Sequence, residues 1–184
     1  MKALTCPVAA LSILLGLLAG CGEDPEPSPL EGLYLDQRTP GLTPEVFAPG
    51  ILSQAGFHLH SSLAFSPDGT EVYFTEHVSE PEVRGTIRNM RLENGEWTGP
   101  RTVSFSGVHN DDSAVFSPGG ERLWFTSTRP VDAEQVPGDF NIWYVERRGG
   151  HWGEPVYAGD TLNTPHSEWR LTFTRDGTMY LSSN

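Results

Sequence analysis

A short phrase occurs three times in the chain and limits what the chain can fold into. The copies are SSLAFSPDGTEVYFT from residue 61, DSAVFSPGGERLWFT from residue 112 and WRLTFTRDGTMYLSS from residue 169. They align without gaps, and the shared residues are Phe65, Phe116 and Phe173 together with Gly69, Gly120 and Gly177. The phenylalanines are 51 and 57 residues apart. A period near 50 residues indicates one supersecondary unit per repeat.

Each phrase alternates with period two on both sides of a turn, which predicts two antiparallel strands rather than a helix. In the first copy Pro67 presets φ for the turn and Gly69 accepts a positive φ. We expect strands over residues 61–66, 71–75, 86–92 and 101–105 in the first unit. In the second unit we expect them over 114–117, 122–127, 141–146 and 156–158. The three repeated phenylalanines should be buried in the first strand of each unit.

A second, smaller motif follows the third strand of each complete unit. It reads GEWTGP over residues 95–100 and GHWGEP over 150–155. We interpret Trp97 and Trp152 as side chains that pack between neighbouring sheets. The alternative is a stacking platform for a sugar ring. The prolines suit a fourth strand at the outer edge, where no ladder donor is needed.

One four-stranded sheet of this size cannot bury both of its faces. Stacking such sheets radially around a channel buries them against one another. The sequence therefore predicts an all-β fold, a β-propeller of four-stranded antiparallel blades, over residues 44–184.

The repeated phrases also resemble a known repeat. SSLAFSPDGTEVYFT, DSAVFSPGGERLWFTSTRP and LTFTRDGTMYLSSN are similar to the TolB-like, WD-repeat-like propeller repeat. The second copy departs from it at Gly119, where Asp is expected, and the third has Thr174-Arg175 in place of Ser-Pro. The resemblance implies the propeller fold and marks blade geometry, but it assigns no site.

The blade count is incomplete in this interpretation. The stretch Pro44–Ala48 resembles residues 154–158, a fourth strand, yet it precedes any first strand. The sequence then holds this N-terminal outer strand and about two and a half blades, whereas propellers typically have at least four. We expect the chain to be the N-terminal part of a longer protein or a truncated reading frame.

The N-terminus predicts export. Met1-Lys2 is followed by an apolar run over residues 3–17 and then by Leu18-Ala19-Gly20-Cys21. This ending resembles the bacterial lipobox and implies a lipoprotein signal peptide over residues 1–20 with lipidation of Cys21. A plain secretory signal with an incidental cysteine is the alternative. Residues 21–43, acidic and proline-rich, are expected to form a tether, and the cell envelope is the expected location. The alternative for this stretch is an N-terminal piece of the fold, which only residues 30–35 support.

The charge limits the partners. The formal net charge is −12, with 24 acidic residues against 12 Lys and Arg. This excludes a nucleic-acid backbone, which requires a basic surface. The membrane, through lipidated Cys21, and an envelope protein or glycan remain as expected partners.

Candidate site residues fall at repeated positions on one predicted rim. Seven residues before each repeated phenylalanine stand His58, His109 and His166, a candidate site for a divalent metal. Further rim residues that could bind a ligand are His60, His77, Asp111, Arg129, Asp139 and Glu168. The simpler interpretation is that these side chains hydrogen-bond the backbone of the adjacent blade. We favour it, because equivalent positions on different blades are usually too far apart to share one ion.

Two classes of function remain open. The first is a binding or scaffold lipoprotein that needs no cofactor. The second is a propeller enzyme, such as a metal-dependent lyase or a glycan hydrolase, with its site at the channel mouth. No motif that would activate a serine nucleophile is present in the sequence, so we favour the scaffold.

Overall fold

The computed structural model describes residues 32–37, 41–52, 58–59, 61–77, 85–132 and 138–184. Within these ranges the chain is almost entirely β, apart from the 3-10 turn η1 (Leu33–Asp36). No helix in the same ranges is long and apolar enough to cross a membrane. The signal peptide and most of the expected tether lie outside the described residues.

The strands form three antiparallel sheets that follow the three repeats. Sheet 1 contains β1 (His58–Leu59), β2 (Ala64–Phe65), β3 (Glu71–His77), β4 (Gly85–Glu93), β5 (Glu96–Trp97) and β6 (Arg101–Thr102). Sheet 2 contains β7 (Asp111–Phe116), β8 (Arg122–Ser127), β9 (Asn141–Arg148), β10 (His151–Trp152) and β11 (Val156–Tyr157). Sheet 3 contains β12 (Glu168–Phe173) and β13 (Met179–Ser183).

The order of pairing confirms four antiparallel strands in each of the first two repeats. Sheet 1 pairs β2 with β3, β3 with β4 and β4 with β6, and sheet 2 pairs β7, β8, β9 and β11 in the same way. The predicted strand over 122–127 coincides with β8. The strands predicted over 61–66 and 101–105 are shorter, at Ala64–Phe65 and Arg101–Thr102.

The third repeat departs from the gapless alignment. Phe65 pairs with Val72 and Phe116 pairs with Leu123, each seven residues on. Phe173 instead pairs with Met179, six residues on. A slip of one residue turns every following side chain to the other face of the sheet. Met179 therefore packs against sheet 2, while Tyr180 is 61% exposed.

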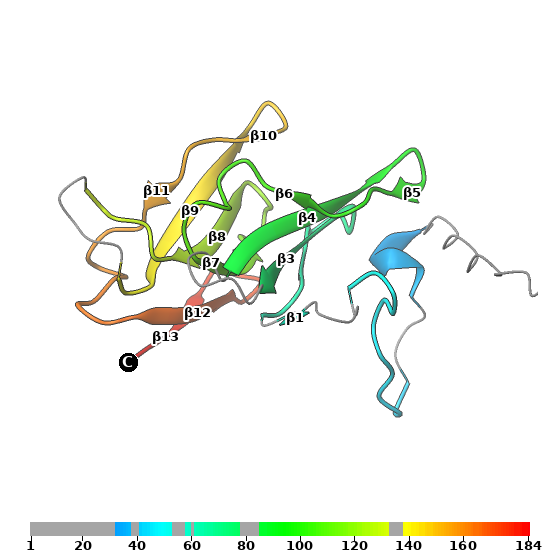
Figure 1. Ribbon diagram of the computed structural model, residues 1–184, viewed down its shortest axis with the longest axis horizontal. Helices are drawn as coiled ribbons and strands as arrows, with labels where there is room; N and C mark the ends of the chain where they lie inside the picture. Colours follow the sequence, from blue (N-terminus) through cyan, green and yellow to red (C-terminus); the bar gives the residue numbers. More distant parts are fainter. Residues whose placement is uncertain (1–31, 38–40, 53–57, 60, 78–84, 133–137) are drawn as a thin grey trace, which may run out of the picture.

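Sheets 1 and 2 lie face to face (Figure 1), and a hydrophobic core cluster fills the space between them. Sheet 1 contributes Ala64, Tyr73 and Ile87 to this core cluster. Sheet 2 contributes the larger set, which is Ala114, Phe116, Leu123, Phe125, Trp143 and Val145. Phe105, from the segment between the two sheets, lies tilted against Phe125 with ring centroids 5.2 Å apart. The linking segment thus closes the same core.

Sheet 3 stacks on the opposite face of sheet 2. Trp124 and Ile142 from sheet 2 meet Leu171 from β12 in a smaller buried cluster. Phe173 and Met179, both half-buried, pack against it. Alternate residues of β8 consequently face different neighbours, with Leu123 and Phe125 toward sheet 1 and Trp124 toward sheet 3.

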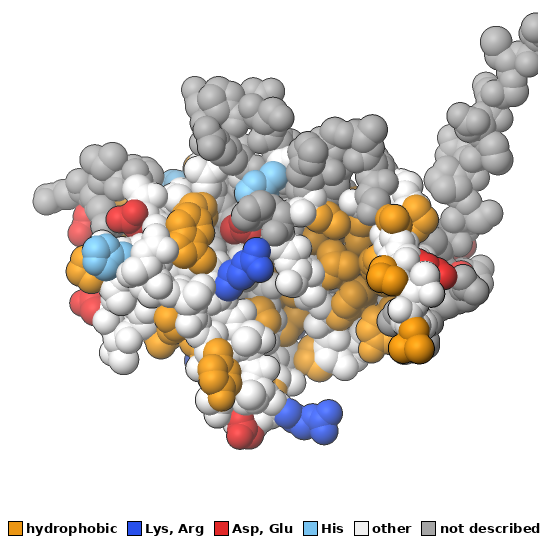
Figure 2. Space-filling view, turned by 90° about the horizontal axis from the view of Figure 1, so that it is seen from below, with side chains coloured by type: hydrophobic (Ala, Val, Ile, Leu, Met, Phe, Trp, Pro, Cys, Tyr) orange, Lys and Arg blue, Asp and Glu red, His pale blue; other side chains and the backbone are white. Residues whose placement is uncertain are grey.

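An N-terminal segment covers the other face of sheet 1. Leu35, Ala48 and Leu52 are buried against Val72, Phe74, Met90 and Trp97 of sheet 1. Leu35 belongs to the stretch expected to be tether, so part of that stretch lies in the hydrophobic core. Figure 2 shows hydrophobic side chains gathered on this side of the molecule, in the right half of the view.

The outer strand predicted at Pro44–Ala48 is not formed, which corrects the sequence-based expectation. No strand lies within residues 41–52, Val46 is 65% exposed, and Ala48 has a φ of 45°. A fourth strand needs a third strand as its hydrogen-bonding partner. Within the described residues, sheet 3 consists of β12 and β13 and has no third strand that could pair with it.

The repeated phenylalanines all point toward the preceding layer, but only one is fully enclosed. Phe116 is 7% exposed, between Tyr73 and Trp152. Phe65 and Phe173 are half-buried, so the expectation that all three would be buried is wrong for these two. Phe65 faces the thinner N-terminal segment, where Tyr34 and Phe47 are its ring neighbours.

We predict that Phe116→Ala lowers the free energy of unfolding by about 3–5 kcal/mol, as for buried aromatic side chains generally. Phe65→Ala is the matched control and should cost less, because Phe65 keeps more of its surface in water. Urea titration followed by tryptophan fluorescence measures both. A cost below about 1 kcal/mol for Phe116→Ala would contradict the packing of sheets 1 and 2.

Candidate ligand-binding rim

Five of the predicted rim residues lie at one edge of the stacked sheets. His77 ends β3, Asp111 begins β7, Arg129 follows β8, Asp139 precedes β9 and Glu168 begins β12. In antiparallel sheets these strand ends meet at the same edge, as the pairs His77 with Gly85 and Asp111 with Ser127 show. Cys21 and His60 lie outside the described residues. His58 pairs with His77 through its backbone, and its side chain is also outside the description.

Arg129 and Asp111 form a buried ion pair. Arg129 Nη2 lies 2.8 Å from Asp111 Oδ1, and the two side chains are 9% and 0% exposed. Arg129 also donates to the backbone oxygen of Phe105 at 2.9 Å and, through Nε, to Ser127 Oγ at 2.8 Å. Ser106 Oγ donates to the second oxygen of Asp111 at 2.6 Å. Buried charges are tolerated when paired and hydrogen-bonded in this way.

The same guanidinium also lies over two aromatic rings. Its carbon is 4.9 Å from the ring centre of Phe125 and 5.4 Å from that of Trp143. Because Phe105 and Ser106 belong to the segment that leads from sheet 1 to sheet 2, Arg129 fixes this segment to the end of β8. The geometry matches the simpler interpretation of these rim residues, in which they hold the backbone of neighbouring units.

A second polar link joins sheets 1 and 2 directly. His77 Nε2 lies 3.1 Å from Asp112 Oδ2, and the other oxygen of Asp112 accepts from the Ser113 amide at 2.6 Å. Ser113 has a φ of 55°, at the irregularity in β7 between Asp112 and Val115. A Cβ added at Gly85 would lie 2.7 Å from the backbone oxygen of Asp111. The close approach of the two sheets therefore requires glycine at this position.

Asp112 was not among the predicted site residues, although its neighbour Asp111 was. Burial works to raise the pKa of Asp112, but the hydrogen bond from the Ser113 amide and the nearby His77 outweigh it. The pKa of Asp112 is consequently lowered from its usual value. The sequence signal for this residue was the acidic pair itself, which placed two carboxylates at the start of one strand.

Glu168 and Asp139 are also engaged in local contacts. Glu168 is fully buried, and its Oε1 accepts from the amide and hydroxyl of Thr164 and from Ser183 Oγ at 3.1, 2.7 and 3.1 Å. Ser167 Oγ donates to Asp139 Oδ1 at 3.2 Å. Both contacts tie the loop before β12 to its surroundings.

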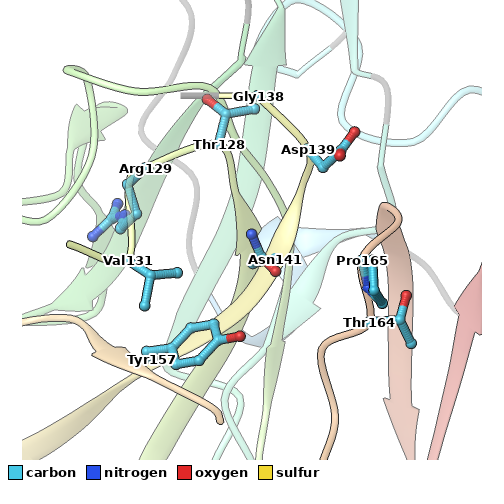
Figure 3. Close-up of a pocket in the computed structure, with 9 residues that line it drawn as sticks. All are labelled: Thr128, Arg129, Val131, Gly138, Asp139, Asn141, Tyr157, Thr164 and Pro165. Carbon is cyan, nitrogen blue, oxygen red and sulfur yellow. The ribbon is translucent and has the colours of Figure 1, made fainter. Parts of the chain in front are cut away.

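A pocket of about 220 Å³ lies at this edge of sheet 2, and Figure 3 shows its lining. Two predicted rim residues, Arg129 and Asp139, belong to it, but the Arg129 guanidinium points away from Asn141 at the centre. The hydroxyl of Tyr157 donates to Asp160 Oδ1 at 3.1 Å. Burial, and then Asp160, raises the pKa of Tyr157, so this hydroxyl stays protonated at neutral pH. The pocket offers hydrogen-bonding groups and one aromatic ring rather than an acid–base pair.

The described residues do not assemble a metal site. Among them no group of three or more His, Cys, Asp or Glu could hold an ion. His109 is half-buried and His166 is exposed. Because the His58 side chain is outside the description, the three-histidine site stays a prediction.

We predict that Arg129→Met lowers the free energy of unfolding by about 3–5 kcal/mol, because it leaves Asp111 as an uncompensated buried charge. Arg148→Met is the matched control, since Arg148 is 81% exposed beside Glu146, and such surface pairs contribute about 0–1 kcal/mol. Denaturant titration of both variants measures the difference. Equal losses would contradict the role of Arg129 in holding the rim.

We predict that Asp112→Asn makes the protein less sensitive to acid. A carboxyl whose pKa is lowered on folding stabilises the folded state above its unfolded pKa, near 3.9, and loses that contribution as the pH falls further. The wild type should lose stability below about pH 4 more steeply than the variant. Urea midpoints between pH 3 and pH 6 measure this, and parallel curves for the two proteins would rule it out.

Comparisons with known proteins leave the family open. No protein-family model matches the chain, and no curated protein matches it. Among solved structures, hydrazine synthase of Kuenenia stuttgartiensis is similar at 16% identity, with a TM-score of 0.44 over 65% of this chain and 35% of that one. A puromycin-hydrolysing peptidase of Mycobacterium tuberculosis is similar at 21% identity, with a TM-score of 0.44 over 66% of this chain. The chain covers only 18% of that peptidase.

Proposed function

We propose that this chain is a lipid-anchored protein of the bacterial cell envelope that presents a β-propeller as a rigid scaffold for binding an envelope protein or glycan. The observation that carries the proposal is that the charged residues at the rim are buried and hydrogen-bonded. Asp111, Arg129 and Asp112 are buried and bonded to their own fold, and Glu168 is bonded to it through Oε1, so they stiffen the loops instead of being poised for chemistry. Stiff loops on a stacked framework suit recognition.

The propeller interpretation is supported by the way in which the repeats are arranged. Each of the first two repeats has the same strand order, and each turns its repeated phenylalanine toward the preceding layer. The innermost strands β2, β7 and β12, with β13, line one groove of about 520 Å³. A groove shared by the first strands of successive units is what blades around a channel would produce.

Further blades complete the ring in this proposal. Sheet 3 has two strands among the described residues, and Tyr180, which pairs with Thr172 on the face turned away from sheet 2, is 61% exposed. A propeller buries such side chains against the next blade. The TolB-like character of the repeat belongs to the same proposal and depends on the repeated Phe-Ser-Pro-Asp-Gly phrase.

We predict that the protein partitions with membranes and that Cys21→Ser releases it. Lipidation with more than one acyl chain anchors a protein stably, whereas a single chain does not. Cys6→Ser is the matched control, because Cys6 lies within the expected signal peptide and should not affect anchoring. Fractionation and intact-mass analysis measure this. A wild type that is wholly soluble with Met1 retained would refute the anchor, and stoichiometric bound metal would refute the cofactor-free scaffold.

A further inference from the structure

A tryptophan of sheet 2 packs against sheet 1. Trp152, in the β9–β10 hairpin, donates from Nε1 to the hydroxyl of Tyr73 at 2.8 Å. Its ring lies 6.2 Å from the ring of Tyr73 and 6.1 Å from that of Phe116. Arg147 covers the outer side of the indole at 4.4 Å. This hairpin seals the outer part of the interface between the two sheets.

The equivalent tryptophan of sheet 1 packs against the N-terminal segment that covers this sheet. Trp97, in the β4–β5 hairpin, is 8% exposed and lies in the cluster with Leu35 and Leu52. Its Nε1 donates to the backbone oxygen of Gly32 at 2.6 Å. Two consecutive interfaces are therefore closed in the same way, by the indole of the later unit against the earlier layer.

At the third interface the corresponding place is open. Trp124 in the second repeat is equivalent to Tyr73 in the first, because each directly follows the residue that pairs with the repeated phenylalanine. Likewise, Phe173 in the third repeat is equivalent to Phe116 in the second. The rings of Trp124 and Phe173 are 5.8 Å apart. They line a pocket of about 720 Å³ together with Met179 and Arg122, which we call the Trp124 socket. Trp124 is 9% exposed, and its Nε1 has no hydrogen-bond acceptor among the described residues.

The rim end of sheet 3 has a second unmatched group. Asp111, at the start of β7, uses one oxygen for Ser106 and the other for Arg129. Glu168, at the start of β12, uses Oε1 for Thr164 and Ser183, while its buried Oε2 has no partner within the described part of the chain. A buried carboxylate oxygen without a donor is costly. In sheet 2 the donor to the equivalent carboxylate, Asp111, is Arg129, which lies between the second strand (β8) and the third strand (β9).

We propose that the Trp124 socket receives the aromatic side chain of a β-hairpin that completes the third repeat, and that the same segment supplies a cation to Glu168. This rests on the proposed function, in which further blades complete the ring. The occupant is a strand that pairs with β13, preceded by an Arg and followed by a tight turn and a Trp, as in residues 129–152. At the two preceding interfaces a hairpin tryptophan of the later unit occupies the place that is open in the socket. A hairpin of the same repeat type therefore fits the socket. Within the described ranges a second copy of the chain offers no free Trp hairpin, since Trp97 and Trp152 already donate hydrogen bonds within their own chain.

The test uses a labelled peptide with the sequence of residues 128–158, which holds Arg129, the third strand and Trp152. The full chain is titrated into this peptide and fluorescence anisotropy is measured. We expect saturable one-to-one binding, at least tenfold weaker for the peptide with Trp152→Ala. Phe173→Ala in the protein should weaken binding similarly. Tyr180→Ala is the control and should leave it unchanged, because Tyr180 lines the groove of the inner strands instead of the socket.

A second arm tests the cation. Arg129→Ala in the peptide should weaken binding to the wild-type protein severalfold but make no difference with Glu168→Gln protein. Equal binding of the peptides with and without the Trp152→Ala substitution would overturn the socket, whatever the membrane fractionation of Cys21→Ser shows. Light scattering that reveals a dimer displaced by the peptide would also overturn it, because a second copy would then occupy the face. Circular dichroism confirms that the protein variants are folded.

Discussion

The structure depends on the fact that sheets 1 and 2 are apolar on both faces. In β3 the side chains of Val72 and Phe74 point one way and that of Tyr73 points the other, yet all three are completely buried. A sheet of this kind has no face for water, so it is stable only between two neighbours. The N-terminal segment and sheet 2 fill these two places for sheet 1. Stacking is therefore the condition under which each repeat can fold.

Stacking also explains why the polar residues at the rim look like a site. Where two layers meet, the loops between strands bring backbone groups into a region with little water, and each needs a partner. Arg129 satisfies the oxygen of Phe105 and pairs with Asp111, while Asp112 binds the Ser113 amide and reaches His77 of the neighbouring sheet. These charges are expensive to bury and would be destabilising singly. In pairs they fix the distance between layers, which a binding surface needs.

The sequence predicted what depends on pattern and missed what depends on register and on distant contacts. Alternation and turn residues located the strands, including the whole of β8, and the spacing of Trp152 predicted its place between two sheets. The alternation in the third repeat could not show that Phe173 pairs with Met179, because a shortened turn leaves the pattern unchanged. The apolar residues 30–35 were the one hint that part of the expected tether belongs to the fold, and Leu35 is buried there. The contact between His77 and Asp112 was missed because neither side chain carries a local signal for a partner 35 residues away.

The layers have a direction, and this constrains how a ring could close. The repeated phenylalanines and the hairpin tryptophans all face the preceding layer, so each unit completes the one before it. For sheet 1 that preceding layer is the segment with Leu35, Ala48 and Leu52, which lies where the last blade of a closed propeller would pack. Both cannot cover Val72 and Phe74 at once. A closing blade must therefore displace this segment or incorporate it, for example by taking up Pro44–Ala48, whose sequence resembles an outer strand, at its edge.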